Sequence, residues 1–230
     1  MRLLGILGVS TALLVPSLVR AGDVRGTLWV SHAAAAHAPA DPRPGGAAVA
    51  AEVRSQRGVG DAVVWLVDVP DKVERKLAAP PHHWFWQHPR PERLPCVVQR
   101  DHQFVPHVLA VPSGGAVEFR NLDRIYHNVF SVSAARPFDL GKYPPGRADT
   151  VTFRRPGVVN LHCDIHPDEL GFVVVVPNHA CARPDSLGAF QLPKLPPGHY
   201  EVHAWHPRLG ELKYAFDVPR RGDVTLRLVF

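Results

Sequence analysis

The segment VVNLHCDIHPDEL (residues 158–170) places a cysteine between two histidines and follows them with acidic residues. Side chains alternate between faces along a β-strand, so Cys163 belongs to the apolar face of this strand and His162 to the opposite, more polar face. His166 lies three residues later, in a turn closed by Pro167. A Cys-x-x-His turn can bring a thiolate and an imidazole to one centre, which suits copper or zinc.

A second segment, NLDRIYHNVF (residues 121–130), places His127 at the start of another strand. Alone, the Cys-x-x-His pair is a weak signal, because a buried cysteine beside a surface histidine is the commoner case. In a β-sandwich, however, the strand end at His127 can lie beside the strand end at Cys163. With His166, these residues would form the two-histidine, one-cysteine set of trigonal blue-copper sites.

The elements that must position these residues are short strands. The chain has 230 residues, and its 24 prolines, 18 glycines and valine-rich runs are typical of strands joined by tight turns. Six segments between residues 104 and 176 predict strands: FVPHVLAV, GAVEFRN, HNVFSVS, DTVTFRR, GVVNLHC and GFVVVV. Further strands are predicted before and after them, and DKVERKLAA (residues 71–79) is the candidate helix. We predict an all-β fold.

The first 21 residues have the pattern of a secretory signal peptide. Arg2 precedes an apolar run, and Ala21 ends a small-residue cleavage site. The run is too short to span a membrane and is interrupted by Pro16. We therefore expect an exported protein, periplasmic or secreted, with no membrane span in the mature chain.

The charge pattern argues against a nucleic-acid partner. The formal net charge is +5, and the basic residues are scattered and not interleaved with aromatic ones. The sequence also lacks paired carboxylates, a nucleophile elbow, a phosphate-binding glycine loop and a haem-attachment motif. These absences make an enzyme the weaker interpretation.

Three cysteines are present, and an oxidising compartment favours pairing two of them. Cys163 lies among histidines, so we expect it to be the free thiolate. Cys96 and Cys181 would then form a disulfide. Three reduced thiols or a different pairing remain open alternatives.

The segment from residue 104 to residue 177 resembles the cupredoxins, the plastocyanin-like copper proteins. The resemblance rests on NLDRIYHNVFSVS as the first ligand region and PGVVNLHCDIHPDELGFVVVV as the ligand loop, and FDLGKYPPG between them is similar to exported, methylamine-utilisation-like members. It implies a Greek-key β-sandwich that binds copper through His127, Cys163 and His166, with Asn128 helping to tie the two ligand loops together.

The chain departs from this family at the axial ligand. Short-loop members usually carry methionine three residues after the second loop histidine, where this chain has Glu169. The only methionine is Met1, which would be lost with the signal peptide. The alternatives are an oxygen of Glu169, a backbone carbonyl, or no axial ligand, with Glu169 then pointing into solvent. A carboxylate would favour Cu(II) and lower the reduction potential relative to a thioether.

The ends of the chain resemble carboxypeptidase-regulatory-like, transthyretin-type β modules, on AVVWL before the copper motifs and the LPPG turn after them. We therefore expect one sandwich from residues 23–79 plus 181–230, a connecting segment at 80–101, and a cupredoxin domain at 102–178 inserted between its strands. One continuous sandwich is the alternative. The His- and Trp-rich stretch 82–88 could be a second metal site or a partner surface.

Together these features predict a type 1-like copper protein that acts as a one-electron carrier without an axial methionine. Its partner would be a redox protein such as a cytochrome or a dehydrogenase. Two alternatives remain open. One is a copper-binding protein with a carboxylate-bound or open site, used in copper handling or small-molecule redox chemistry. The other is a metal-free β binding module.

Overall fold

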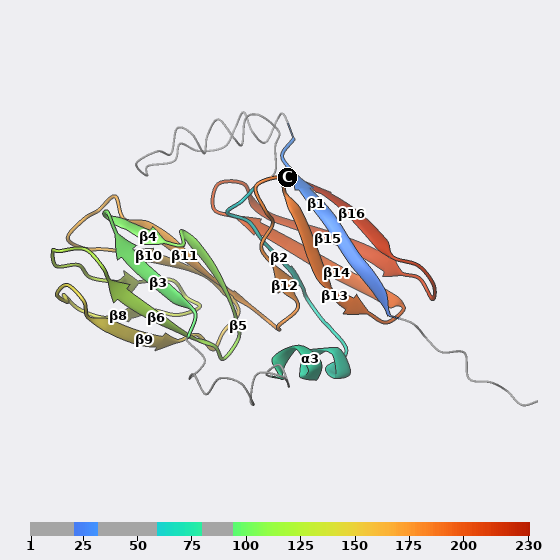
Figure 1. Cartoon of the computed structure of the whole chain (residues 1–230), viewed down its shortest axis with the longest axis horizontal. Helices are drawn as coiled ribbons and strands as arrows, with labels where there is room; N and C mark the ends of the chain where they lie inside the picture. Colours follow the sequence, from blue (N-terminus) through green and yellow to red (C-terminus); the bar gives the residue numbers. More distant parts are fainter. Residues whose placement is uncertain (1–20, 32–58, 80–93) are drawn as a thin grey trace, which may run out of the picture.

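The computed structural model describes residues 21–31, 59–79 and 94–230, in which all regular secondary structure is β-strand apart from one helix (Figure 1). The all-β prediction is confirmed. The expected helix is α3 (Asp71–Ala78), and no helix among the described residues is long and apolar enough to cross a membrane. The expected signal peptide and the His- and Trp-rich stretch 82–88 lie outside the described residues.

Two sheets formed between residues 96 and 176 make a first unit. Their strand orders are β5–β11–β10–β7–β8 and β4–β3–β6–β9. The strands are β3 (Cys96–Arg100), β4 (Gln103–Val105), β5 (Val108–Pro112), β6 (Ala116–Asn121), β7 (Phe130–Ser131), β8 (Phe138–Asp139), β9 (Ala148–Thr152), β10 (Gly157–His162) and β11 (Leu170–Val176). All six strand segments predicted for this region contain strands.

Two further sheets, with orders β13–β1–β16 and β12–β2–β14–β15, make a second unit. The strands are β1 (Gly22–Trp29), β2 (Val63–Leu66), β12 (Cys181–Ala182), β13 (Ala189–Leu195), β14 (Gly198–His206), β15 (Gly210–Val218) and β16 (Val224–Val229). Strands that precede the first unit in the sequence thus pair with strands that follow it.

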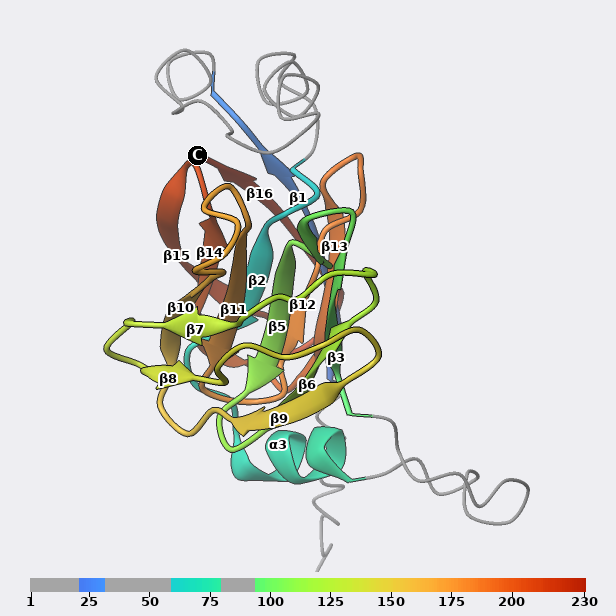
Figure 2. The ribbon, with the colours of Figure 1, turned by 90° about the vertical axis from the view of Figure 1, so that its left-hand side faces the viewer.

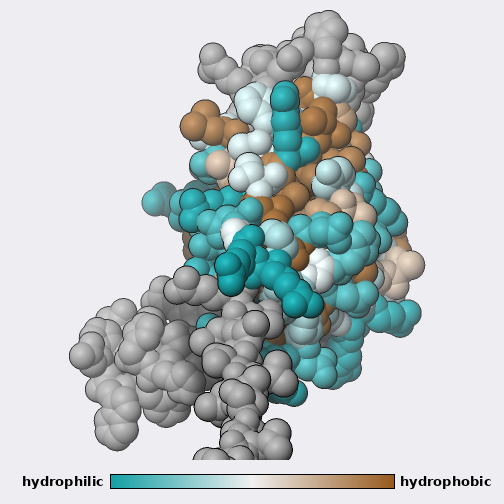
Figure 3. Space-filling model, turned by 90° about the vertical axis from the view of Figure 1, so that its right-hand side faces the viewer, coloured by the Kyte–Doolittle hydropathy of each residue, from teal (hydrophilic) through white to brown (hydrophobic). Residues whose placement is uncertain are grey.

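On the outward face of the second unit, hydrophobic residues gather toward the top of the view and hydrophilic residues lie below them (Figure 3).

Strand β11 is buried on both faces and joins the two units. Val173 and Val175 point into the core of the first unit, whereas Phe172 and Val174 belong to a separate apolar cluster between the units. In that cluster Trp205 of β14 packs on Phe172, with ring centroids 5.2 Å apart. The uninterrupted apolar run of β11 reflects this double burial. In Figure 2, β5 and β11 lie in front of β2 and β12.

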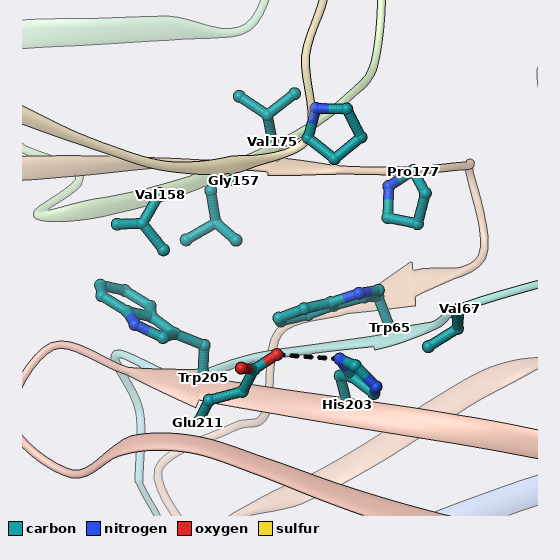
Figure 4. Close-up of a pocket in the computed structure, with 11 residues that line it drawn as sticks. Trp65, Val67, Gly157, Val158, Val175, Pro177, His203, Trp205 and Glu211 are labelled. Atoms are coloured by element: carbon teal, nitrogen blue, oxygen red, sulfur yellow. Dashed lines mark hydrogen bonds and ion pairs between the residues drawn. The ribbon is translucent and has the colours of Figure 1, made fainter. Parts of the chain in front are cut away.

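A cavity of about 610 Å³ opens along this contact between the units (Figure 4). Trp65 and Trp205 line it from the second unit, and residues of β10 and β11 line it from the first. Its polar side is His203, whose Nδ1 lies 2.9 Å from Glu211 and whose Nε2 contacts Glu201. Both ring nitrogens of this histidine are therefore occupied by carboxylates.

The predicted disulfide between Cys96 and Cys181 is wrong, because both cysteines are free thiols. Cys96 begins β3 and lies opposite Glu118 in the first unit. Cys181 lies in β12 opposite Trp65 in the second unit. Each sulfur is fixed in a strand of a different sheet, and a disulfide requires closely apposed backbones.

The expected connecting segment at 80–101 also differs from the structure at its end. Residues Cys96–Arg100 form strand β3, which pairs in parallel with β6 and antiparallel with β4. Val97 and Gln99 are both buried. The inward-facing polar residue Gln99 interrupts the apolar pattern that would have predicted a strand.

Gly171 of β11 is required for close packing. A Cβ atom at this position would lie 2.7 Å from the Cβ of Phe104. We expect Gly171→Ala to lower the free energy of unfolding by about 1–3 kcal/mol, because overpacking forces neighbouring groups apart. Chemical denaturation measures the effect. Gly60→Ala is the control, since no atom of the described residues lies within 4 Å of its added Cβ. Equal losses in both variants would contradict this prediction.

Candidate metal centre

Four potential metal ligands from two separate segments meet at one end of the first unit. His127 lies between β6 and β7, and Cys163, His166 and Glu169 lie in the turn that joins β10 to β11. One donor atom from each of the four residues lies within 4.8 Å of all the others. The fold therefore brings together the four residues of the expected copper site.

The turn carrying three of these residues is fixed by the strands on either side of it. His162 and Leu170 are paired as the last residue of β10 and the first of β11. Within the turn, the Glu169 backbone N–H donates to the carbonyl of His166 at 3.0 Å. The fourth residue, His127, is held by two backbone hydrogen bonds with Tyr143, at 3.2 and 2.9 Å.

The distances between donor atoms fit a small metal ion. The Nδ1 atoms of His127 and His166 are 3.2 Å apart, and they lie 3.9 and 3.7 Å from the sulfur of Cys163. Oε1 of Glu169 lies 2.8 and 3.2 Å from the same two nitrogens. Nitrogen and sulfur donors bound tetrahedrally to one first-row ion would be about 3.3–3.6 Å apart. The nitrogen–nitrogen and nitrogen–sulfur distances here lie a few tenths of an ångström outside this range, so small movements of the side chains would complete the site.

Glu169 is buried, with 1% of its surface exposed, so the alternative that it points into solvent is wrong. Its Oε2 accepts a hydrogen bond from Gln99 at 2.6 Å, whereas in the described part of the chain its Oε1 has no assigned hydrogen-bond donor and faces the two histidine nitrogens. Burial raises the pKa of this carboxyl group. An unpartnered buried carboxylate oxygen beside two imidazole nitrogens is costly unless a cation is present.

Both histidines present a ring nitrogen suited to a metal. Burial lowers the pKa of His127 and of His166, which favours the neutral imidazole. Nε2 of His127 lies 3.0 Å from the carboxylate of Asp123. A carboxylate at Nε2 favours the tautomer with its proton there, which leaves the Nδ1 lone pair directed at the centre.

Cys163 is buried, and its sulfur accepts a hydrogen bond from the backbone N–H of Asn128 at 3.5 Å. Burial raises the pKa of the thiol, so a metal must displace a proton to bind it. The contact between the two ligand segments that was expected of Asn128 is made here by its backbone. The side-chain Oδ1 of Asn128 has no hydrogen-bond partner.

The sequence analysis missed a turn that covers the centre. The ring of His102 stacks on that of His166, with centroids 4.7 Å apart and planes at 25°. His102 and Asp101 both have positive φ angles, and both backbone N–H groups donate to the carboxylate of Asp123. Asp123 therefore fixes the position of this turn and also orients the ring of His127.

Two further buried residues were missed, Gln99 and Tyr143. Gln99 contacts Glu169, and the Tyr143 hydroxyl donates to the Gln99 carbonyl oxygen. Neither residue stands in a motif with metal-ligand spacing. Only the pairing of β3 with β6 brings Gln99 to the centre.

Asp123 provides a test of this supporting shell. We expect Asp123→Ala to raise the dissociation constant for Cu(II) about 10–100-fold, because groups that orient metal ligands typically have effects of this size. Isothermal titration with Cu(II) measures it. Asp139→Ala is the matched control, since Asp139 also accepts a backbone N–H in a turn, that of Gly141. Equal losses in both variants would show that Asp123 does not act through His127.

No protein-family model and no curated protein sequence matches the chain. Among solved structures, a purple cupredoxin from Nitrosopumilus maritimus aligns with 35% of this chain and 98% of its own, at 22% identity and a TM-score of 0.33. An oxidised amicyanin mutant aligns with 38% of this chain and 86% of its own, at 24% identity and a TM-score of 0.35. A copper-containing nitrite reductase from Thermus scotoductus aligns with 46% of this chain and 27% of its own, at 30% identity and a TM-score of 0.37. Each of these alignments covers less than half of the chain.

Proposed function

We propose that this chain is a one-electron carrier that binds copper through His127, Cys163 and His166, with Glu169 as the fourth donor. The observation that carries the proposal is the convergence of these four donor atoms within 4.8 Å. A thiolate and two imidazoles favour copper over harder ions. Bound there, copper would supply one-electron exchange between Cu(I) and Cu(II).

The surrounding residues suit electron transfer because they hold the donors in fixed positions. His127, Cys163 and Glu169 are buried, and paired strands flank the turn that carries two of them. The positions of rigidly held donor atoms change little between the Cu(I) and Cu(II) states. This lowers the reorganisation energy of electron transfer. The Asn128 N–H at the sulfur would help to set the reduction potential.

The surface beside the centre suits a transient protein partner. Leu122, Ile125 and Tyr126 precede His127, and each is more than a third exposed. Such exposed apolar groups mark contact surfaces. We propose a redox protein such as a cytochrome or a dehydrogenase as the partner, in the periplasm or outside the cell.

We also propose that the copper-binding domain at 102–178, extended by β3, is inserted into a transthyretin-type sandwich formed by residues 23–79 and 181–230. The proposal is supported by the pairing of β2 with β12 and β14, strands on either side of the insertion in the sequence. The apolar cluster at β11 would then hold the copper-binding domain against the transthyretin-type sandwich.

A second candidate is a copper protein for small-molecule redox chemistry or copper handling. It is favoured by the absence of any methionine other than Met1, and it requires Glu169 to bind the copper loosely or not at all. In this case the copper ion would have an open coordination position for a ligand from outside the protein.

Titration of the mature protein with Cu(II), followed by visible absorption and EPR, tests the main proposal. We expect uptake of one equivalent, an intense thiolate-to-copper band, and a single reversible one-electron step in a redox titration. Added azide should leave the spectrum unchanged for a carrier, whereas a change would favour the second candidate. The absence of a thiolate band would refute a copper–cysteine site.

A further inference from the structure

Gln99 of β3 is a buried amide whose hydrogen-bond partners all belong to the metal centre or to its support. It is 1% exposed. Its Nε2 donates to Oε2 of Glu169 at 2.6 Å and to the backbone carbonyl of Asn128 at 3.1 Å, and its Oε1 accepts from the Tyr143 hydroxyl. A buried amide with this many fixed partners is rigid.

The partners of Gln99 determine which way its amide faces. The Asn128 carbonyl can only accept a hydrogen bond, so it requires the NH₂ group of Gln99 on its side. The Tyr143 hydroxyl then donates to the oxygen on the other side. Tyr143 is itself fixed. It is 1% exposed, and its backbone N–H and carbonyl both form hydrogen bonds with the backbone of His127. The amide group therefore has one orientation, with Nε2 toward Glu169.

This orientation divides the roles of the two Glu169 oxygens. Oε2 is held by Gln99 at 2.6 Å. Oε1 has no assigned hydrogen-bond donor among the described residues, and it lies 2.8 Å and 3.2 Å from the Nδ1 atoms of His127 and His166. With Oε2 held toward Gln99, Oε1 is the oxygen that faces the two histidine nitrogens and is placed to bind a metal.

We infer that Gln99 is a positioning residue that holds Glu169 as a one-oxygen donor and thereby closes the copper site to small outside ligands. The inference rests on the proposed copper centre and deepens it. Glu169 fills the position that an outside ligand would need, and Gln99 keeps Glu169 from turning away or binding through both oxygens. The closed site is the property expected of an electron carrier.

Gln99→Leu tests the inference, because leucine keeps the approximate volume and removes both hydrogen-bonding groups. We expect the dissociation constant for Cu(II) to rise about 10–100-fold, the thiolate-to-copper band and EPR signal to shift, and azide to change the spectrum. Gln191→Leu is the control, since Gln191 is exposed in β13 of the second unit. Tyr143→Phe removes only the donor to Gln99 and should shift the spectrum in the same direction by less.

A double-mutant cycle separates action through Glu169 from a general structural effect. In a Glu169→Gln background, Gln99→Leu should cause little further change in the spectrum or in the azide response. In the metal-free protein, NMR should show the Gln99 side-chain amide protons protected from exchange, and Glu169→Leu should reduce that protection. This readout needs no copper.

Different results overturn different claims. A folded Gln99→Leu variant with an unchanged spectrum and no azide response would overturn the role of Gln99 while leaving the copper centre intact. An equal spectral shift whether or not residue 169 is a carboxylate would overturn action through Glu169. No thiolate band in the unmodified protein would instead refute the proposed function, and with it any role of Gln99 in copper binding.

Discussion

Cys163→Ser is expected to abolish the intense visible band of the copper-loaded protein. The band requires a thiolate bound to Cu(II), and a serine hydroxyl is a harder donor that stays protonated at neutral pH. The sulfur of Cys163 is buried and lies 3.7 and 3.9 Å from the two histidine nitrogens, and it is the cysteine of the donor cluster. We therefore expect complete loss of the band and weaker copper binding. Visible absorption and EPR during a Cu(II) titration measure both effects.

The other two cysteines supply matched controls for this prediction. Cys96 and Cys181 are also free thiols, but they lie in β3 and β12 and do not belong to the donor cluster. Cys96→Ser and Cys181→Ser should keep the band at full intensity. If the band persists in Cys163→Ser, or is lost in either control, the assignment of the copper–sulfur bond to Cys163 is wrong.

The part of the site that depends on local sequence could be predicted. Side chains alternate along a strand, and this rule alone places Cys163 inward and His162 toward the polar side. The burial pattern of β10 and the 3% exposure of Cys163 confirm it. The short spacing from Cys163 to Glu169 likewise keeps three donors within one turn between paired strands.

The supporting residues could not be predicted, because contacts between distant segments bring them to the centre. Gln99 and Glu169 are 70 positions apart, and Asp123 binds the turn at His102 from 21 positions away. A polar residue in a strand gives no indication of its partner. The disulfide prediction failed for a related reason: a count of cysteines says nothing of the distance between Cys96 and Cys181.

The run of apolar residues in β11 predicts a buried strand but does not indicate what covers its two faces. GFVVVV predicted a strand, and β11 confirms it. The same run did not indicate that Phe172 and Val174 would pack against a second unit. Continuous apolar runs arise whenever both faces of a strand are covered, whatever covers them.

Glu169→Met is expected to raise the reduction potential of the bound copper. The carboxylate is buried beside the two histidines, and its negative charge stabilises Cu(II) more than Cu(I). Methionine removes the charge and offers a soft thioether, which favours Cu(I). A unit charge about 4 Å away contributes about 4 kcal/mol at an effective dielectric constant of about 20, so we expect a rise on the order of 100–200 mV.

A redox titration monitored at the thiolate-to-copper band measures this change. Asp168→Asn is the matched control, because Asp168 is the preceding residue, carries the same charge and is exposed to solvent. Screening by water should limit its effect to a small fraction of that of Glu169→Met. Equal shifts in both variants would contradict a special effect of the buried Glu169 carboxylate on the copper. A much larger shift at Glu169 is the result expected of a buried carboxylate beside the copper, and a changed EPR signal in Glu169→Gln, which adds no thioether, would support its oxygen as a ligand.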